Sequence, residues 1–206
     1  MYLQQERALA RLLLMSEQAL AKLIFYLWKK SFMNFSVQPT LENNNFKLIP
    51  LQETDFERLY SVASDPKIWE QHPNKERYKR EVFQNFFKGA MESEGAFLVT
   101  NKSTGDVLGC TRFYDYDNGN RSILIGYTFY GTDSWGKNVN PQVKKMMLDY
   151  IFQHVETVIF HVGKENIRSQ IAMQRLGAQK VGEEEITYFG ESPKINVVYE
   201  IKKENW

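Results

Sequence analysis

The stretch that decides the fold is ILIGYTFYGTDSWGKNVNPQVKKMMLDYI, residues 123–151. Its first part, residues 123–130, is rich in β-branched and aromatic residues, which is typical of a strand. Gly, Asp, Ser and Asn cluster in residues 131–139, which predicts a loop. Asn140 and Pro141 fit the N-cap and the first position of a helix. Apolar or aromatic side chains then recur at helical spacing, at Val143, Met146, Met147, Tyr150 and Ile151.

A strand, loop and helix in this order form a potential anion site. The first amides of a helix have no acceptor within the helix, and the helix dipole adds positive potential at that end. Phosphate or pyrophosphate is the anion best suited to such a site. An ordinary strand-to-helix turn is the alternative interpretation of the same residues.

Length and composition describe one domain with a short extension. A chain of 206 residues can bury a full-sized core. Its 26 basic and 25 acidic residues nearly cancel, so the charge indicates no nucleic-acid partner. The single cysteine, Cys110, excludes an intrachain disulfide and fits a reducing compartment, so we expect a cytoplasmic location. With one cysteine and 3 scattered histidines, no metal site is expected.

Residues 1–32 differ from the rest of the chain. Leucine and isoleucine recur on one helical stripe with charged residues between them, which predicts an amphipathic helix. Charges interrupt the apolar runs before they reach a bilayer-spanning length. Three interpretations stay open: a helix docked on the domain, a helix that binds a membrane surface or a partner, and an extension not native to the domain. We expect residues 1–44 to form a helical extension and linker, and residues 45–206 to form the domain.

The first half of the domain is predicted to begin with a strand and two helices. Residues 46–51 form the strand, and a capping box of Thr54 and Glu57 opens a helix that ends near Ala63. The second helix spans residues 77–90, with its apolar side chains on one face. Strands at 95–100, 107–114 and 123–130 follow one another through tight turns. These three strands must therefore be antiparallel neighbours.

The second half is predicted to add one parallel strand and an antiparallel pair. Residues 157–162 form a strand joined to residues 123–130 through a helix, which makes the two strands parallel. Asn166 caps the next helix and Gly177 is its C′ residue. Closing strands at 179–189 and 194–201 complete the order β-α-α-β-β-β-α-β-α-β-β. The predicted class is α+β, with a mixed, mostly antiparallel central sheet and helices on both faces.

Three short motifs occur in order along the chain. The first is Ile125-Gly126-Tyr127 followed by Trp135-Gly136-Lys137, the second is Leu148-Asp149-Tyr150-Ile151-Phe152, and the third is Asn166-Ile167-Arg168-Ser169 followed by Leu176-Gly177-Ala178. With the order of elements, they resemble the GNAT acyl-CoA-dependent N-acetyltransferases, and more closely the RimJ/RimL-type branch. The resemblance covers roughly residues 45–201.

The resemblance implies direct transfer of an acetyl group from acetyl-CoA to a primary amine. The acceptor is a protein N-terminal α-amine or a small-molecule amine. The resemblance also implies a set of contacts that hold the cofactor. These contacts come from the strand, the loop after it and the start of the later helix, namely Tyr127, Thr128, Phe129, Trp135, Gly136, Lys137, Asn138, Val139, Asn140, Asn166 and Ser169.

The resemblance also implies roles in catalysis. Ser169 would protonate the departing thiolate, or else serve only as a first-turn helix serine. The amide near Tyr130 would stabilise the oxyanion. Trp69 and His72 would line the acceptor pocket, with a core position as the alternative for Trp69. The general base is not identified, and the candidates are Asp133, Asp115, Glu70, Tyr127 and a water chain.

One departure from the family pattern concerns the phosphate loop. Asn138 and Asn140 stand where the family has small residues. Asparagine tolerates a left-handed backbone better than other non-glycine residues, so the loop can still present its amides. The alternative function is a GNAT-shaped module that binds an acyl-CoA or a partner without turnover. The sequence leaves monomer and homodimer open.

Overall fold

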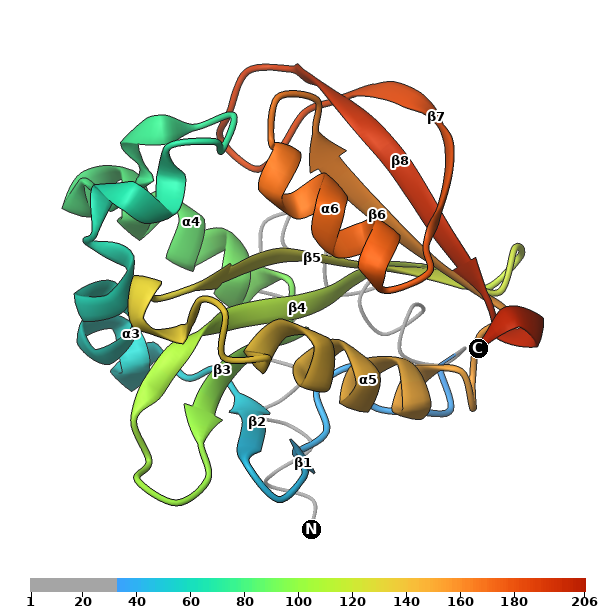
Figure 1. Cartoon of the computed structure of the whole chain (residues 1–206), viewed down its shortest axis with the longest axis horizontal. Coiled ribbons are helices and arrows are strands. Elements are labelled where there is room, and N and C mark those ends of the chain that lie inside the picture. The colour runs from blue at the N-terminus through green and yellow to red at the C-terminus, as the bar shows by residue number, and fades with distance from the viewer. Residues whose placement is uncertain (1–32) are drawn as a thin grey trace, which may run out of the picture. The chain divides into compact units, whose positions relative to one another are not determined.

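The computed structural model describes residues 33–206, of which residues 37–206 form one compact unit (Figure 1). The expectations for residues 1–32 lie outside the described residues. The strands are Leu41–Glu42 (β1), Phe46–Pro50 (β2), Ala96–Asn101 (β3), Val107–Asp117 (β4), Ser122–Tyr130 (β5), Thr157–Gly163 (β6), Gln179–Ile186 (β7) and Lys194–Lys202 (β8). The α-helices are Phe56–Ala63 (α3), Arg80–Glu92 (α4), Val139–Ile151 (α5) and Ile167–Arg175 (α6). No helix within this part of the chain is long and apolar enough to cross a membrane.

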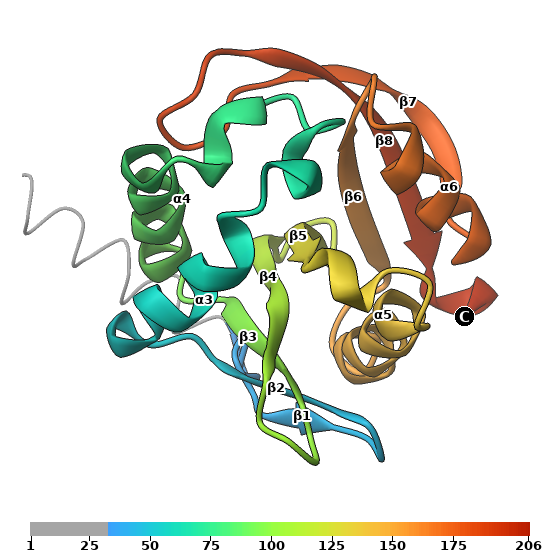
Figure 2. The same cartoon turned by 60° about the vertical axis from the view of Figure 1, so that its left-hand side comes forward.

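The predicted α+β fold is confirmed. One sheet of 8 strands has the order β1-β2-β3-β4-β5-β6-β8-β7. β5 and β6 are parallel, and every other neighbouring pair in it is antiparallel. Figure 2 shows α3 and α4 on one side of the sheet and α5 and α6 on the other. The short strand β1 pairs with β2 within the stretch that we expected to be a linker.

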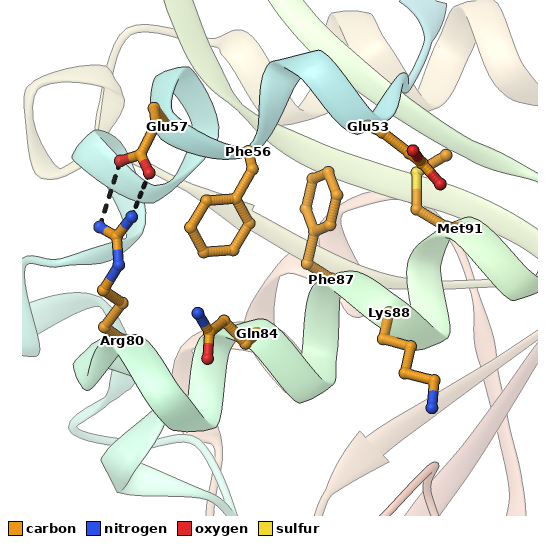
Figure 3. A pocket seen from close by; sticks show the side chains of 8 residues that line it. All are labelled: Glu53, Phe56, Glu57, Arg80, Gln84, Phe87, Lys88 and Met91. Atoms are coloured by element: carbon orange, nitrogen blue, oxygen red, sulfur yellow. Dashed lines mark hydrogen bonds and ion pairs between the residues drawn. The ribbon is translucent and has the colours of Figure 1, made fainter.

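The start of the first helix differs from the prediction. Thr54 and Glu57 do not form a capping box. Instead, the backbone N–H of Gln52 donates to Oδ2 of Asp55 at 3.1 Å, and a 3-10 turn, Glu53–Asp55, precedes α3. The carboxylate of Glu57 pairs with Arg80 of α4 (Figure 3), so a long-range ion pair takes the side chain that the local pattern assigned to the cap.

The end of α6 confirms the prediction for Gly177. Its φ is +86°, a conformation that glycine adopts without steric cost. The N–H of Gly177 donates to the carbonyl of Gln174 and the N–H of Ala178 to that of Met173, both at 3.0 Å. These two bonds are the pattern of a Schellman cap, which turns the chain from α6 into β7.

An aromatic core lies between the sheet and the pair α3–α4. Trp69 packs against Phe129 of β5 with ring centroids 5.0 Å apart, and Phe83 stacks on Phe86 at 5.3 Å. Contacts of this kind each contribute about 0.5–1.5 kcal/mol beyond the burial of apolar area. This core fixes one face of β5, the strand on which the candidate site is built.

Candidate active site

The parallel pair β5–β6 opens after its first three positions. Register pairs run only from Ser122 with Thr157 to Leu124 with Ile159, and β6 then continues in contact with β8. A bulge in β5 lies opposite β4 in the open part, and Tyr127 within it has a φ of +52°. A positive φ is a genuine outlier for a bulky residue, and such outliers cluster at functional sites. From residue 125 onward, the side of β5 that faces β6 has no strand pairing in the described chain.

The amide of Tyr130 faces this opening. The N–H of Gly131 donates to the carbonyl of Leu108 in β4 at 2.9 Å. Because successive amides of a strand point to opposite sides, the N–H of Tyr130 points away from β4 and toward the β6 side. The side chain of Tyr130 is buried, its hydroxyl has no hydrogen-bond partner among residues 33–206, and burial raises its pKa far above the ordinary value. Only the backbone of Tyr130 is therefore available at the opening.

The loop that follows β5 alternates between ordinary and left-handed residues. Gly136 has a φ of +73° and Asn138 a φ of 57° with ψ 26°. Asn138 is the N-cap residue of α5, so the prediction that Asn140 is the cap and Pro141 the first helical residue was wrong. The helix begins at Val139, which puts Pro141 third in the first turn. Proline is tolerated there because first-turn amides have no acceptor within the helix.

The left-handed conformation of Asn138 leads to a test of the phosphate loop. If this loop holds the phosphate groups of a ligand such as an acyl-CoA, Asn138→Ala should weaken that binding, because alanine in this conformation costs about 1 kcal/mol or more. Asn138→Gly should bind at least as tightly as the wild type, because glycine adopts the conformation freely and removes a side chain beside the anion. Isothermal titration calorimetry with both variants measures the difference. Equal affinities for the two variants would contradict a requirement for this backbone conformation.

The first turn of α6 lies against the loop that follows β5. The guanidinium carbon of Arg168 is 3.9 Å from the ring centroid of Trp135, and the N–H of Arg168 donates to Oε1 of Gln71 at 2.9 Å. Asn166 caps the helix, since its Oδ1 accepts the N–H of Ser169 at 3.1 Å. Oγ of Ser169 makes no hydrogen bond to another described residue. Asn166, and not the first-turn serine, therefore caps this helix. The hydroxyl of Ser169 is left available to a ligand.

The two residues expected in the acceptor pocket have different surroundings. Trp69 is 2% exposed in the aromatic core, and its Nε1 donates to the carbonyl of Ala63 at 2.7 Å, so the core alternative describes its position. His72 is half-buried. Its Nδ1 lies 3.1 Å from the carbonyl oxygen of Asn74, to which it donates, and its Nε2 lies 3.1 Å from Nη1 of Arg77. Burial, with Arg77 as the next cause, lowers the pKa of His72 well below its usual value, so the ring is neutral and accepts from Arg77.

The candidate bases are not brought together. Asp133, Asp115 and Glu70 are exposed. Tyr127 is half-buried, and burial raises the pKa of its hydroxyl. Cys110 is buried, which raises the pKa of its thiol to about 11, so it is not a nucleophile at neutral pH. No group of three or more His, Cys, Asp or Glu side chains within residues 33–206 could hold a metal ion.

Three basic side chains are buried on the two faces of the sheet, and the sequence analysis did not identify them. Arg77 and Arg112 lie on the α4 side of the sheet and are 3% and 2% exposed. Lys144 of α5 lies on the other side, where its Nζ donates to Oγ1 of Thr111 at 3.0 Å and to Oγ1 of Thr128 at 2.7 Å. Burial lowers the pKa of Lys144 to about 7. Lys144 follows Val143 and precedes Leu148 by four residues, so it lies on the apolar stripe of the helix. This position in the sequence was the available signal that its side chain is buried.

A pocket of about 490 Å³ lies elsewhere, between α3 and α4 (Figure 3). Phe56 and Phe87 lie in its centre, and the ion pair of Glu57 with Arg80 stands at its side. None of the predicted site residues lines it. The candidate site is therefore not this pocket but the open side of β5 with the loop and helix start beside it.

Comparisons with known proteins concern the domain as a whole. Residues 45–179 match the family model described as the acetyltransferase (GNAT) domain. No curated protein matches the chain at a significant level. A GCN5-related N-acetyltransferase from Brucella melitensis has a similar fold, with a TM-score of 0.70 and 19% sequence identity over 84% of this chain and 85% of that chain.

Two structures from Vibrio cholerae are similar as well. A putative ribosomal-protein-serine acetyltransferase has a TM-score of 0.62 and 14% identity over 82% of this chain and 99% of its own. A spermidine N-acetyltransferase in complex with CoA and spermine has a TM-score of 0.61 and 15% identity over 79% and 98%. At these identities the likeness concerns the fold alone.

Proposed function

Because the chain belongs to the GNAT acetyltransferase family, we propose that it transfers an acetyl group from acetyl-CoA to a primary amine. The acceptor is the N-terminal α-amine of a protein or a small-molecule amine. The observation that carries the proposal is the opening between β5 and β6, with a phosphate-type loop at its end and the first turn of α6 beside that loop. A parallel pair that stayed closed along β5 would leave no strand edge for a thioester.

The residues present fit a CoA ester. The left-handed residues Gly136 and Asn138 turn the loop after β5 into the start of α5, where the free amides and the helix dipole favour a pyrophosphate. Lys137 is exposed and adds a positive charge. Between Tyr127 and Phe129, the backbone groups of β5 that face its open side would hold the pantetheine arm. Asn166, which caps α6, would also contact the pantetheine arm.

Acetyl-CoA supplies an activated acyl thioester. In the proposed reaction the N–H of Tyr130 stabilises the negative charge that develops on the carbonyl oxygen, because this amide points to the opening. Ser169 gives a proton to the departing thiolate through a hydroxyl that no described residue engages. The amine must lose a proton, since the pKa of a free α-amine is about 8. No buried carboxylate among residues 33–206 stands ready to take it, and the candidate bases remain Asp133, Asp115, Glu70, Tyr127 and a water chain.

Acetyl-CoA is expected to stabilise the folded chain. A pyrophosphate docked on a native helix N-terminus binds only the folded state, so the gain is about 2.7 kcal/mol at a hundredfold excess over the dissociation constant. For a domain of this size the melting temperature should rise by several degrees. Differential scanning fluorimetry with acetyl-CoA, and with adenosine as a control that lacks the pyrophosphate, measures the effect. A melting temperature that is unchanged at saturating acetyl-CoA would refute the cofactor assignment.

A second assay separates the enzyme from a binding module. Purified protein is incubated with acetyl-CoA and a panel of amines, and free thiol is measured. Thiol release that depends on an amine supports direct transfer. Stabilisation by acetyl-CoA without amine-dependent release would instead support the non-catalytic alternative. The left-handed backbone of Asn138 weakens the argument for that alternative from the phosphate loop, because asparagine adopts this conformation more readily than other non-glycine residues.

A further inference from the structure

Two buried guanidinium groups lie close together on the α4 side of the sheet, and one of them is fully satisfied. Nε and Nη2 of Arg77 donate to Oε1 of Glu191, at 3.1 and 2.5 Å. Nη1 of the same group donates to the neutral ring of His72 at 3.1 Å. Arg77 thus has a carboxylate on one edge of its guanidinium and an imidazole on another.

The second group, Arg112, has only one hydrogen-bond partner among the described residues. Its Nη1 donates to the carbonyl of Gly89 in α4 at 2.9 Å. Nε and Nη2 are buried and have no partner among residues 33–206. Burial, and to a smaller extent the charge of Arg77, lower the pKa of Arg112. The buried charge of Arg112 therefore destabilises the folded state.

The aromatic neighbours do not remove this deficit. The guanidinium carbon of Arg112 lies 3.8 Å from the ring centroid of Tyr127 and 5.5 Å from that of Phe86. A ring this close takes the flat face of a guanidinium, whereas the N–H groups point outward in its plane. The cation–π contact therefore leaves Nε and Nη2 without an acceptor in the described chain.

The two unpartnered donors belong to the same edge of the guanidinium. Nε–H and one N–H of Nη2 are parallel, at the spacing that receives the two oxygens of a carboxylate. The corresponding edge of Arg77 is the one that binds Glu191. The site therefore contains one occupied and one unoccupied carboxylate-binding edge, and its buried charge is positive in excess.

We propose that the free edge of Arg112 binds a carboxylate of the acceptor, so that the acceptor class is amines that also carry a carboxylate, such as free amino acids. This inference rests on the proposed acyl transfer. Arg112 pairs with Gly126 in the register of β4 and β5, next to the bulge where the strand edge opens. Half-exposed Tyr127 covers the flat face of the guanidinium, and the carboxylate would bind in the plane of the group, at the edge formed by Nε and Nη2. The same excess of positive charge disfavours polyamine acceptors.

The closing experiment compares acceptors that differ only in this group. Free amino acids are tested against their carboxamides, which have nearly the same shape without the charge, and against spermidine. We expect kcat/KM for the acids to exceed that for the carboxamides by about 100-fold, the size of a charge-assisted bidentate contact. In Arg112→Gln this ratio should fall close to 1. Arg80→Gln, a change at an exposed arginine paired with Glu57, should leave the ratio unchanged.

Binding provides a readout that does not depend on turnover. N-acetyl amino acids and their carboxamides are titrated calorimetrically into the wild type, Arg112→Gln and Arg80→Gln. Only the acids should bind, and only the Arg112 variant should lose that binding. If Arg112→Gln does not fold, the comparison of acids with carboxamides in the wild type decides alone.

The outcomes distinguish this inference from the proposed function. Equal use of acids and carboxamides, preference for spermidine, or an unchanged ratio in Arg112→Gln would overturn the carboxylate site and leave acyl transfer standing. Absence of both acetyl-CoA stabilisation and thiol release would overturn the proposed function and, with it, the acceptor class. Selective binding of N-acetyl amino acids through Arg112 would still support the carboxylate site in that case.

Discussion

Ser169→Ala is expected to lower kcat and kcat/KM together by about 10- to 1000-fold and to leave the affinity for acetyl-CoA nearly unchanged. Ser169 lies in the first turn of α6, beside the loop that would hold the pyrophosphate, and Asn166 already caps its backbone N–H. Its hydroxyl therefore has no partner to lose among the described residues. If it gives a proton to the departing thiolate, its contribution is made mainly in the transition state, and a loss in kcat without a loss in binding follows.

Steady-state kinetics and calorimetric titration of acetyl-CoA are measured on the same preparations. Thioesters with a more acidic thiol should restore part of the lost rate, because their leaving group needs the proton less. Ser61→Ala is the matched control, since that hydroxyl donates to the carbonyl of Arg58 within α3 at 2.8 Å, away from the site. An unchanged kcat with a raised dissociation constant would show that Ser169 binds the cofactor and is not an acid.

Local features of this fold could be predicted from the sequence. The end of α6 at Gly177 is one of them. A helix C-cap needs a left-handed residue, and a glycine directly after an apolar helical stripe is a local signal for it. The parallel direction of β6 follows from a helical connection, which is also a local pattern. Where local signals competed, the prediction failed. Asn138 and Asn140 both suit a helix start, and the left-handed backbone at Asn138 decided between them.

The charges of the candidate site could not be predicted, because they depend on contacts between distant segments. Arg77 meets Glu191 across 114 positions of the sequence, and Arg112 meets the carbonyl of Gly89 across 23. No periodicity encodes such pairs. A charged residue within an apolar stripe indicates only that the group will be buried, not what it will contact. The position of Lys144 carries this signal, whereas its partners Thr111 and Thr128 come from two strands that meet only in the sheet.

Lys144 should make the stability of the protein depend on pH. Its Nζ is buried with two threonine hydroxyls as its hydrogen-bond partners in the described chain, and its pKa falls from 10.5 to about 7 on folding. Between these two values the unfolded chain binds a proton that the folded chain does not, so the free energy of unfolding rises with pH in this window. Above pH 10.5 Lys144 does not lower the free energy of unfolding. Its destabilising contribution grows as the pH falls and is complete below about pH 7. The loss is several kcal/mol, with an upper limit of about 5 kcal/mol.

Lys144→Met is the variant that isolates this group. Methionine has a similar length and no charge, and Thr111 and Thr128 can bond each other because their Oγ1 atoms are 2.8 Å apart. We expect the variant to be more stable than the wild type at pH 7. The advantage should shrink by about 1.4 kcal/mol per pH unit toward pH 10, as the wild-type amine becomes neutral in the unfolded state too. Urea unfolding of both proteins at several pH values measures the difference, in which all other titrating groups cancel.

The neighbouring lysine supplies the control for this experiment. Lys145 is exposed and pairs with Asp149 at 2.7 Å, one helical turn away. Lys145→Met removes the same charge from the same helix but no buried amine, so it should change stability by only a few tenths of a kcal/mol. If Lys144→Met and Lys145→Met show the same pH dependence, the amine of Lys144 is solvated in the folded state. A pH-dependent gain confined to Lys144→Met requires a buried amine whose pKa is lowered in the folded state, next to the hydroxyls of Thr111 and Thr128.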